Sequence, residues 1–248
     1  MQTEYFLFET GAATDTGRVR DHNEDSYFVR PESGVWVVAD GMGGHDAGDF
    51  ASQTITGEME TVGFSISAGD LQARFMERLG RAHHKIGDHA ISLGGGTVGA
   101  TLVALLVYEE SYACIWSGDS RIYRLRNGTL EQLTRDHTEV RELLDAGMIS
   151  SDEAENWPRK NVITRAIGVS EEPNCDVVSG EIRQGDMFLL CSDGLTEHNS
   201  DEDIAEALKR GQTAQSVCND LIAQTLDRGA KDNVTAVVVR CLPPEPFF

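Results

Sequence analysis

The sequence lacks the marks of several large protein classes. No run of about eighteen apolar residues occurs, so we expect no bilayer-spanning helix. Residues 1–20 show no basic start followed by an apolar segment, so we expect no secretory signal. Internal repeats, heptad series and long Pro/Ser linkers are absent, and a hydrophobic content of 40% excludes a disordered chain. These absences leave a globular domain.

Positive charge is scarce as well. The chain holds 21 lysines and arginines against 41 aspartates and glutamates, which gives a formal net charge of −20. Nucleic acids and anionic lipids both attract basic surfaces, so we expect neither a nucleic-acid partner nor membrane insertion. Most carboxylates are expected to form a solvated acidic surface, and only the position of a minority can indicate a cation site.

Paired cysteines are the third absence. The five cysteines are an odd number, and no two have a C-x-x-C spacing. This usage is typical of reduced thiols in a cytoplasmic protein, and it argues against a disulfide framework or structural zinc. Cys114 and Cys191 lie in apolar runs, where a buried free thiol is the expected state.

Strands and helices are predicted in separate blocks. Asn127-Gly128 supplies the positive φ angles of a tight hairpin turn. Grouped hairpins and separate helices favour an α+β fold of sheet layers covered by helices over alternating βαβ units. Apolar runs predict strands at 35–39, 97–107, 112–116, 121–125, 129–133, 187–191 and 234–239. Amphipathic spacing predicts helices at 47–60, 69–91 and 213–228, and a further helix that begins at Ser200.

Residues 137–176 differ from this pattern. They hold a short helical stretch at 140–146, a capping box at Ser150 and Glu153, and the pair Trp157-Pro158. We interpret them as a flap inserted into a single domain over 1–242, which a short tail at 243–248 follows.

Four aspartates stand next to apolar strands. Asp40 follows Val-Val-Ala, Asp119 follows Ile-Trp-Ser-Gly, Asp193 follows Leu-Leu-Cys-Ser, and Asp232 precedes the strand at 234–239. Strand ends bring distant segments to one rim, where clustered carboxylates repel one another unless a cation lies among them. Oxygen ligands suit magnesium or manganese rather than zinc. The alternative for each aspartate alone is turn chemistry, because Asp-Gly and Asp-Asn pairs often begin turns.

Eight short motifs occur in register along the chain. They are Thr16–Ser26 (TGRVRDHNEDS), Val38–His45 (VADGMGGH), Gly95–Thr101 (GGTVGAT), Ser117–Arg121 (SGDSR), Asp136–Thr138 (DHT), Ile163–Gly168 (ITRAIG), Cys191–Leu195 (CSDGL) and Lys231–Thr235 (KDNVT). Together they resemble the bacterial PP2C-type (PPM family) metal-dependent protein serine/threonine phosphatases over about residues 8–240. The resemblance implies a four-layer αββα sandwich, with two central, mostly antiparallel sheets flanked by helices.

The resemblance also implies a metal centre. By this similarity, Asp40 bridges two Mn²⁺ or Mg²⁺ ions, the Gly41 carbonyl contacts one of them, and Asp193 and Asp232 complete the shell of the first. Asp119, together with Asp193, resembles the site of a third ion in bacterial members. The predicted cofactor is therefore two ions, with a third as an open alternative.

Three further residues complete the expected site. Glu24 is similar to a residue beside the second ion, held largely through water, and Asp25 is the neighbour that could take its place. Arg20 matches the arginine that binds the substrate phosphate, which a guanidinium can do with two hydrogen bonds. Asp40 and Arg20 are thus the predicted catalytic residues. The alternative for Arg20 is a surface arginine.

Several histidine positions decide the acid chemistry. Eukaryotic relatives carry a histidine directly after Asp-Gly as the proposed general acid, whereas this chain has Met42. His45 is the candidate replacement, with a structural role at a helix start as its alternative, and a metal-bound water is an equally good proton donor. The family usually has a histidine before Pro158, where this chain has Trp157, so the flap is expected to contact substrate differently. The long predicted helix carries three more histidines, expected at its surface or boundary: His83, His84 and His89.

The implied activity is hydrolysis of phosphoserine and phosphothreonine in proteins. Two ions can polarise the phosphoryl oxygens and hold a bridging hydroxide for direct attack, so no covalent phosphoenzyme is needed. The resemblance implies phosphoprotein substrates and a cognate bacterial Ser/Thr kinase, in a kinase-linked signalling or secretion system. One alternative is a regulatory binding module that keeps the phosphatase fold without turnover. Another is a metal-dependent hydrolase of small phosphoesters or phosphodiesters.

Overall fold

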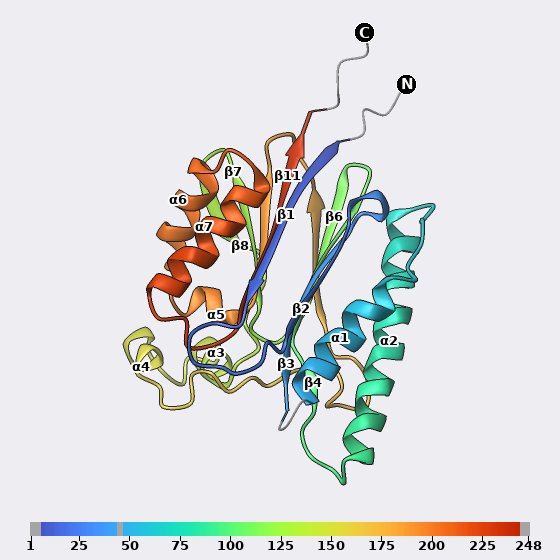
Figure 1. Cartoon of the computed structure of the whole chain (residues 1–248), viewed down its shortest axis with the longest axis vertical. Coiled ribbons are helices and arrows are strands. Elements are labelled where there is room, and N and C mark those ends of the chain that lie inside the picture. The colour runs from blue at the N-terminus through green and yellow to red at the C-terminus, as the bar shows by residue number, and fades with distance from the viewer. Residues whose placement is uncertain (1–5, 44–46, 244–248) are drawn as a thin grey trace.

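Two antiparallel sheets form the centre of the molecule in the computed structural model, which describes residues 6–43 and 47–243 (Figure 1). The first sheet has the order β1 (Leu7–Asp15), β11 (Val234–Leu242), β10 (Met187–Cys191), β7 (Arg121–Arg126), β8 (Thr129–Gln132). The second has the order β2 (Asp25–Arg30), β3 (Val35–Met42), β5 (Leu102–Tyr108), β6 (Ser111–Ser117), β9 (Asp176–Glu181), and the short β4 (Gly99–Ala100) pairs with β3.

Helices cover both outer faces. Figure 1 shows α1 (Ala47–Met59) and α2 (Ala68–Ser92) on the second sheet, and α6 (Asp201–Arg210) and α7 (Ala214–Asp227) on the first. A one-turn helix, α5 (Asp193–Thr196), follows β10, and a 3₁₀ turn (Pro31–Ser33) joins β2 to β3. The predicted αββα sandwich is therefore confirmed. No helix within the described ranges is long and apolar enough to cross a bilayer.

Three apolar layers hold the sandwich together, and β3 shows how its sequence builds two of them. Val35 and Val37 face α1 and α2, whereas Trp36 and Val38 face the other sheet. Successive strand residues point to opposite faces, so a continuous apolar run is buried on both sides. The third layer lies between the first sheet and α6 and α7.

Local signals place several element ends. Asn127 and Gly128 have φ angles of 51° and 80°, which confirms the predicted hairpin turn between β7 and β8. Ser150 and Glu153 form the predicted capping box of α4 (Ser151–Glu155). The helix expected from Ser200 is α6, whose first turn is also closed by a capping box with Ser200 at the N-cap.

The structure also corrects the predicted strands. β1, β2 and β9 were not predicted, because all three are edge strands that bury too few apolar side chains to stand out. The strand expected over 97–107 is divided at Thr101 into β4 and β5, both of which pair with β3, and the Thr101 N–H donates to the Asp40 carbonyl of β3 at 2.8 Å.

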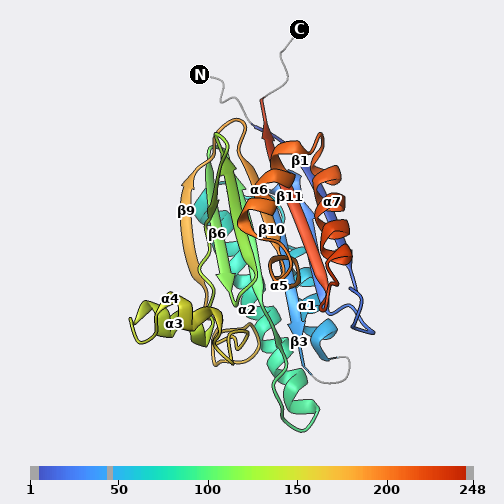
Figure 2. The same ribbon diagram turned by 90° about the vertical axis from the view of Figure 1, so that its left-hand side faces the viewer.

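The segment between β8 and β9 contains the predicted flap. Figure 2 shows its helices α3 (Glu139–Asp145) and α4 apart from the four layers, at the end of the sandwich where β3 finishes. One short bridge, Thr138 with Ile163, joins two parts of this segment to each other, and a second, Ala100 with Ile167, joins the segment to the body. Of the predicted tail at 243–248, residues 244–248 lie outside the described residues.

Candidate metal centre

Acidic side chains reach one end of the sandwich from five separate segments. Asp25 and Asp40 are cross-strand partners on β2 and β3. Asp119 lies in the turn between β6 and β7, Asp193 begins α5 directly after β10, and Asp232 precedes β11. The sequence predicted this meeting for Asp40, Asp119, Asp193 and Asp232, and the structure brings the four together with Asp25 as a fifth member.

Asp40 lies at the middle of this group. Its N–H donates to Thr101 Oγ1 at 3.2 Å, and the same hydroxyl lies 2.7 Å from Ser120 Oγ. Thr101 thereby joins the strand that carries Asp40 to the turn that carries Asp119. Removal from water, followed by the negative charges of the neighbouring aspartates, raises the pKa of Asp40 well above its usual range.

The pKa values of Asp193 and Asp119 are also raised. Burial and then the charge of Asp232 raise the pKa of Asp193 to about 6, and a side-chain hydrogen bond from Asp40 partly offsets this rise. Burial and then the charge of Asp193 raise the pKa of Asp119 to about 8. In both cases the carboxylate form is disfavoured because negative charge is concentrated in a space with little water.

Asp25 is the most deeply buried of the five. Its Oδ2 accepts hydrogen bonds from Ser192 Oγ at 2.7 Å and Thr235 Oγ1 at 2.6 Å. Its Oδ1 is buried and has no hydrogen-bond partner in the described part of the chain. Burial raises the pKa of Asp25 to about 7 despite the two hydroxyl donors. An unpaired buried oxygen of this kind is a position for a cation or for water bound to one.

Arg20 is the cation of this cluster. It lies in the loop between β1 and β2, is 53% exposed, and donates from Nη2 to Asp232 Oδ2 at 2.7 Å. This hydrogen bond is the main cause that raises the pKa of Arg20. Burial raises the pKa of Glu24, and the charge of Arg20 opposes that rise. Both side chains line an open pocket of about 560 Å³, together with His22 and Asp49.

Asn233 holds the loop that carries Arg20. Its Oδ1 accepts from the N–H of Glu24 at 2.8 Å, and its Nδ2 donates to the carbonyls of Thr16 and His22 at 2.9 and 2.8 Å. Three bonds from one buried amide therefore connect the start of β11 to both ends of the Arg20 loop.

The backbone at Gly41 is closely packed. A Cβ on this residue would lie 1.9 Å from the carbonyl oxygen of Gly48 in α1, so no other residue fits. Its N–H donates to the Glu24 carbonyl at 3.0 Å, and Gly41 pairs with Ala100 of β4. These contacts fix the peptide whose carbonyl the sequence predicts as a ligand.

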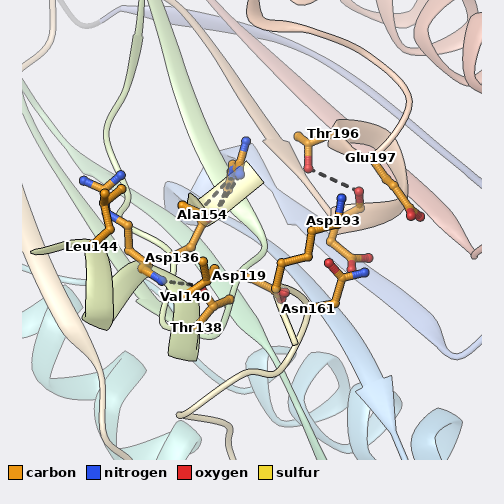
Figure 3. A pocket seen from close by; sticks show the side chains of 13 residues that line it. Asp119, Asp136, Thr138, Val140, Leu144, Ala154, Asn161, Asp193, Thr196 and Glu197 are labelled. Carbon is orange, nitrogen blue, oxygen red and sulfur yellow. Dashed lines mark hydrogen bonds and ion pairs between the residues drawn. The ribbon is translucent and has the colours of Figure 1, made fainter. Parts of the chain in front are cut away.

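A second pocket, of about 330 Å³, lies between this cluster and the flap (Figure 3). Asp119 and Asp193 line it from the body, and Val140, Leu144 and Asn161 line it from the flap. Arg121 also lines the pocket, but its guanidinium is held by Asp136 at 2.7–3.1 Å.

Comparison with known proteins decides the family. Residues 16–238 match the family profile described as Protein phosphatase 2C. The chain is 35% identical over 236 residues to the serine/threonine phosphatase stp of Listeria monocytogenes serotype 4b (strain F2365), which covers 91% of this chain and 93% of that protein. This chain belongs to the protein phosphatase 2C family. The family and the class of enzyme predicted from the sequence, a phosphoprotein phosphatase, are thereby confirmed.

Solved structures of family members have the same fold. "PppA, a key regulatory component of T6SS in Pseudomonas aeruginosa" superposes with a TM-score of 0.89 at 37% identity, over 96% of this chain and 100% of that chain. The catalytic domain of the serine threonine protein phosphatase PstP, described in complex with 2 manganese ions, superposes with a TM-score of 0.85 at 36% identity, over 96% and 99%.

The donor set of this PP2C member fits hard divalent cations. All candidate side chains present oxygen, negative charge exceeds positive charge, and one oxygen of Asp25 lacks a partner. Within 6–43 and 47–243, the side chains as positioned form no group of three or more His, Cys, Asp or Glu residues that could hold a metal ion. One of the candidate acids, Asp232, is instead paired with Arg20, whose Nη2 donates to Asp232 Oδ2 at 2.7 Å.

Sequence reasoning missed the polar residues that support the acids. Ser192, Asn233 and Thr235 contact Asp25 or Glu24 from segments more than 160 positions away. Each lies within three positions of a predicted ligand, in one of the motifs listed above. This closeness in sequence could have indicated that these residues support the acids. His45, the candidate general acid, lies outside the described residues.

Proposed function

We propose that this PP2C member hydrolyses phosphoserine and phosphothreonine in proteins, with two Mn²⁺ or Mg²⁺ ions as cofactors. The observation that carries the proposal is the meeting of five aspartates at one end of the sandwich, where only Arg20 and, beside Asp119, the Asp136-bound Arg121 are described as neighbouring arginines. Such an excess of buried negative charge is stable when cations share the space. The relative PstP, described with two manganese ions, supports the number of ions.

Each residue has a role in this proposal. Asp40 lies between the other acids and would bridge the two ions, with Asp193 and Asp232 on one side and the Gly41 carbonyl and Glu24 on the other. Asp25 would hold water of the ion shell through its unpaired Oδ1. Asp119, whose charge acts on both Asp40 and Asp193, would hold a third ion with Asp193.

The chain's own residues bind and orient the phosphate. Arg20 reaches the cluster from an exposed loop and can exchange its bond to Asp232 for a bidentate bond to a phosphate dianion. Asn233 keeps that loop in place while the exchange occurs. When bound, the ions supply Lewis acidity at the phosphoryl oxygens and lower the pKa of the attacking water, so that direct attack needs no covalent intermediate.

The test is phosphate release from a phosphothreonine peptide. We expect release that depends on Mn²⁺, stops with a chelator, and is absent in the Asp40→Asn variant. Rates of the wild-type protein no higher than those of Asp40→Asn would overturn the proposal. A panel with small phosphoesters and phosphodiesters separates the alternative hydrolase, and Mn²⁺ binding without turnover on any substrate would favour a regulatory binding module.

The cellular setting forms a further part of the proposal. A single phosphatase domain over 1–242 with an inserted flap at 137–176 would oppose a bacterial Ser/Thr kinase in the cytoplasm. All five cysteines are free thiols, as expected in a reducing compartment. The similarity to PppA, described as a regulatory component of T6SS, supports a secretion-linked signalling role. Phosphoproteomics of a deletion strain would test it through phosphosites that increase.

A further inference from the structure

His83 is a buried histidine outside the metal centre. It lies on α2 and is 3% exposed, which corrects the expectation of a surface or boundary position. The neighbouring His84 on the same turn is exposed. His83 stands four residues after Leu79 and three before Ile86, so it occupies the buried stripe of the helix.

Both ring nitrogens of His83 are used. The N–H of Gly168 donates to Nδ1 at 3.0 Å, and Nε2 lies 2.8 Å from the carbonyl oxygen of Ser170. An N–H needs an acceptor and a carbonyl needs a donor, so Nδ1 carries no proton and Nε2 carries one. Only the neutral Nε2–H tautomer satisfies both bonds.

The segment held by His83, residues 167–170, is the last part of the flap connection. Gly168 has φ +95°, and a Cβ there would lie 2.2 Å from Ile86 Cγ2, so the segment is pressed closely against α2. Ile167 exchanges two backbone bonds with Ala100, at 2.8 and 3.0 Å. Residues 167–170 therefore lie between α2 and β4.

β4 lies between residues 167–170 and the part of β3 that contains Gly41. Its two residues pair with Gly41 and Met42 of β3. A Cβ on Gly99 would lie 2.8 Å from the Ile167 carbonyl and 3.2 Å from Met42 Cε, which shows how little space separates the three segments. A shift of residues 167–170 would thus move β4 and the Gly41 peptide with it.

We propose that His83 is a positioning residue for the metal centre. As the neutral Nε2–H tautomer it fixes residues 167–170 against β4, and it thereby sets the position of the Gly41 carbonyl without touching ion or substrate. The inference rests on the proposed function, because it treats the Gly41 carbonyl as a ligand. Supporting residues behind metal ligands are known to change metal affinity by about 10- to 100-fold when replaced.

The tautomer is tested on the wild-type full chain by ¹⁵N NMR of the histidine rings at neutral pH. We expect one buried imidazole with an unprotonated Nδ1 and a slowly exchanging Nε2 proton, whose signals disappear in His83→Asn. A protonated Nδ1 at this residue would overturn the inference. This measurement needs no metal, so its outcome is independent of the proposed function.

The positioning role is tested by Mn²⁺ binding, followed by EPR. His83→Phe keeps an aromatic ring but loses both bonds, and we expect its Mn²⁺ affinity to fall about tenfold. His83→Asn retains an acceptor near Nδ1 and should recover part of that loss. His84→Phe, on the exposed side of the same turn, is the matched control and should bind like the wild type.

The Mn²⁺ measurements distinguish a failure of this inference from a failure of the proposed function. A folded His83→Phe or His83→Asn variant with wild-type Mn²⁺ affinity would overturn it. If His83→Phe does not fold, His83→Asn alone decides, by the same measurement. A wild-type protein that binds no Mn²⁺ would overturn the proposed function, which separates that failure from a failure of His83.

Discussion

Carboxylates at two places in this protein have opposite surroundings: Asp186 is paired with an arginine, whereas Asp40 lies among other acids. Asp186, in the turn between β9 and β10, is 1% exposed and accepts two hydrogen bonds from Arg126, at 2.7 and 2.6 Å, and one from the Arg183 N–H at 2.7 Å. Asp40, in contrast, has other acids as its neighbours, and after burial the charges of Asp25 and Asp193 raise its pKa most. Further carboxylates around Asp40 add to its negative surroundings.

The difference shows that burial of a charge does not by itself mark a functional site. A buried carboxylate with its own arginine is structurally satisfied, because the pair and its hydrogen bonds replace water. A group of five carboxylates with fewer arginines than acids around it retains an excess of negative charge, which added cations or protons can balance. The shortage of positive charge, rather than the number of acids, is therefore what distinguishes the proposed metal centre from the site of Asp186.

The largest expected contrast is in turnover. Asp40→Asn should lower kcat by about three orders of magnitude or more, because the residue proposed to bridge the ions is lost. The metal-free variant should be at least as stable as the wild type, since a carboxylate in negative surroundings has been removed. Steady-state kinetics and urea unfolding measure the two effects. Near-normal turnover by Asp40→Asn would remove Asp40 from the centre.

The opposite result is expected at Asp186. Arg126→Met leaves this buried carboxylate without its cation, and the free energy of unfolding should fall by about 3 kcal/mol. Mn²⁺-dependent kcat of the folded fraction should stay unchanged, because the change lies away from the metal centre. Urea unfolding and kinetics below the unfolding transition test this. A stability equal to that of the wild type would contradict the comparison.

A third prediction concerns Arg20, the arginine that pairs with Asp232 beside the acidic cluster. Arg20→Ala should raise KM for a phosphothreonine peptide about tenfold, because a charged hydrogen bond to the phosphate is lost. Arg20→Lys should recover part of the affinity, since the charge remains but the bidentate geometry does not. Initial-rate kinetics over a range of peptide concentrations separate KM from kcat. A loss confined to kcat would argue against phosphate binding.

The metal-free protein should lose stability as pH rises. Burial and neighbouring charges raise the pKa values of Asp25 and Asp119 to about 7 and about 8, above those of the unfolded chain. Stability from such groups is present when they are protonated and is lost as pH rises through these values. With chelator, Tm should fall by a few degrees between pH 6.5 and pH 8.5, and Mn²⁺ should reverse the trend. A rising Tm with chelator would contradict this.

The smallest effect concerns encounter with substrate. The net charge of −20 should favour phosphopeptides with basic flanking residues, by about threefold in kcat/KM at low salt. Added salt should remove the preference, because exposed charges are screened within about 10 Å at 0.1 M ionic strength. Matched peptides that differ only in flanking charge test this. Equal rates at low salt would show that overall charge does not steer substrates.

Local sequence patterns were enough to predict which acids would meet and in what kind of fold. Asp40, Asp119 and Asp193 lie at or near the ends of apolar strands, and Asp232 lies directly before one. Such runs can be buried only inside a layered fold, and their ends must then lie at its rim. The hairpin turn at Asn127-Gly128 and the capping box at Ser150 were also predictable, because they depend on backbone angles and hydrogen bonds between residues only a few positions apart.

The contacts between distant segments could not be predicted from local patterns and are known from the folded structure. It joined Asp25 to Ser192 and Thr235, and His83 to Gly168 and Ser170, across separations that no local pattern encodes. It also formed the edge strands, whose weak apolar patterns become strands because a neighbour supplies half of their hydrogen bonds. A polar residue such as His83 can be buried on the apolar stripe of a helix when neighbouring segments supply hydrogen-bond partners. Which segments lie next to the helix depends on the whole fold.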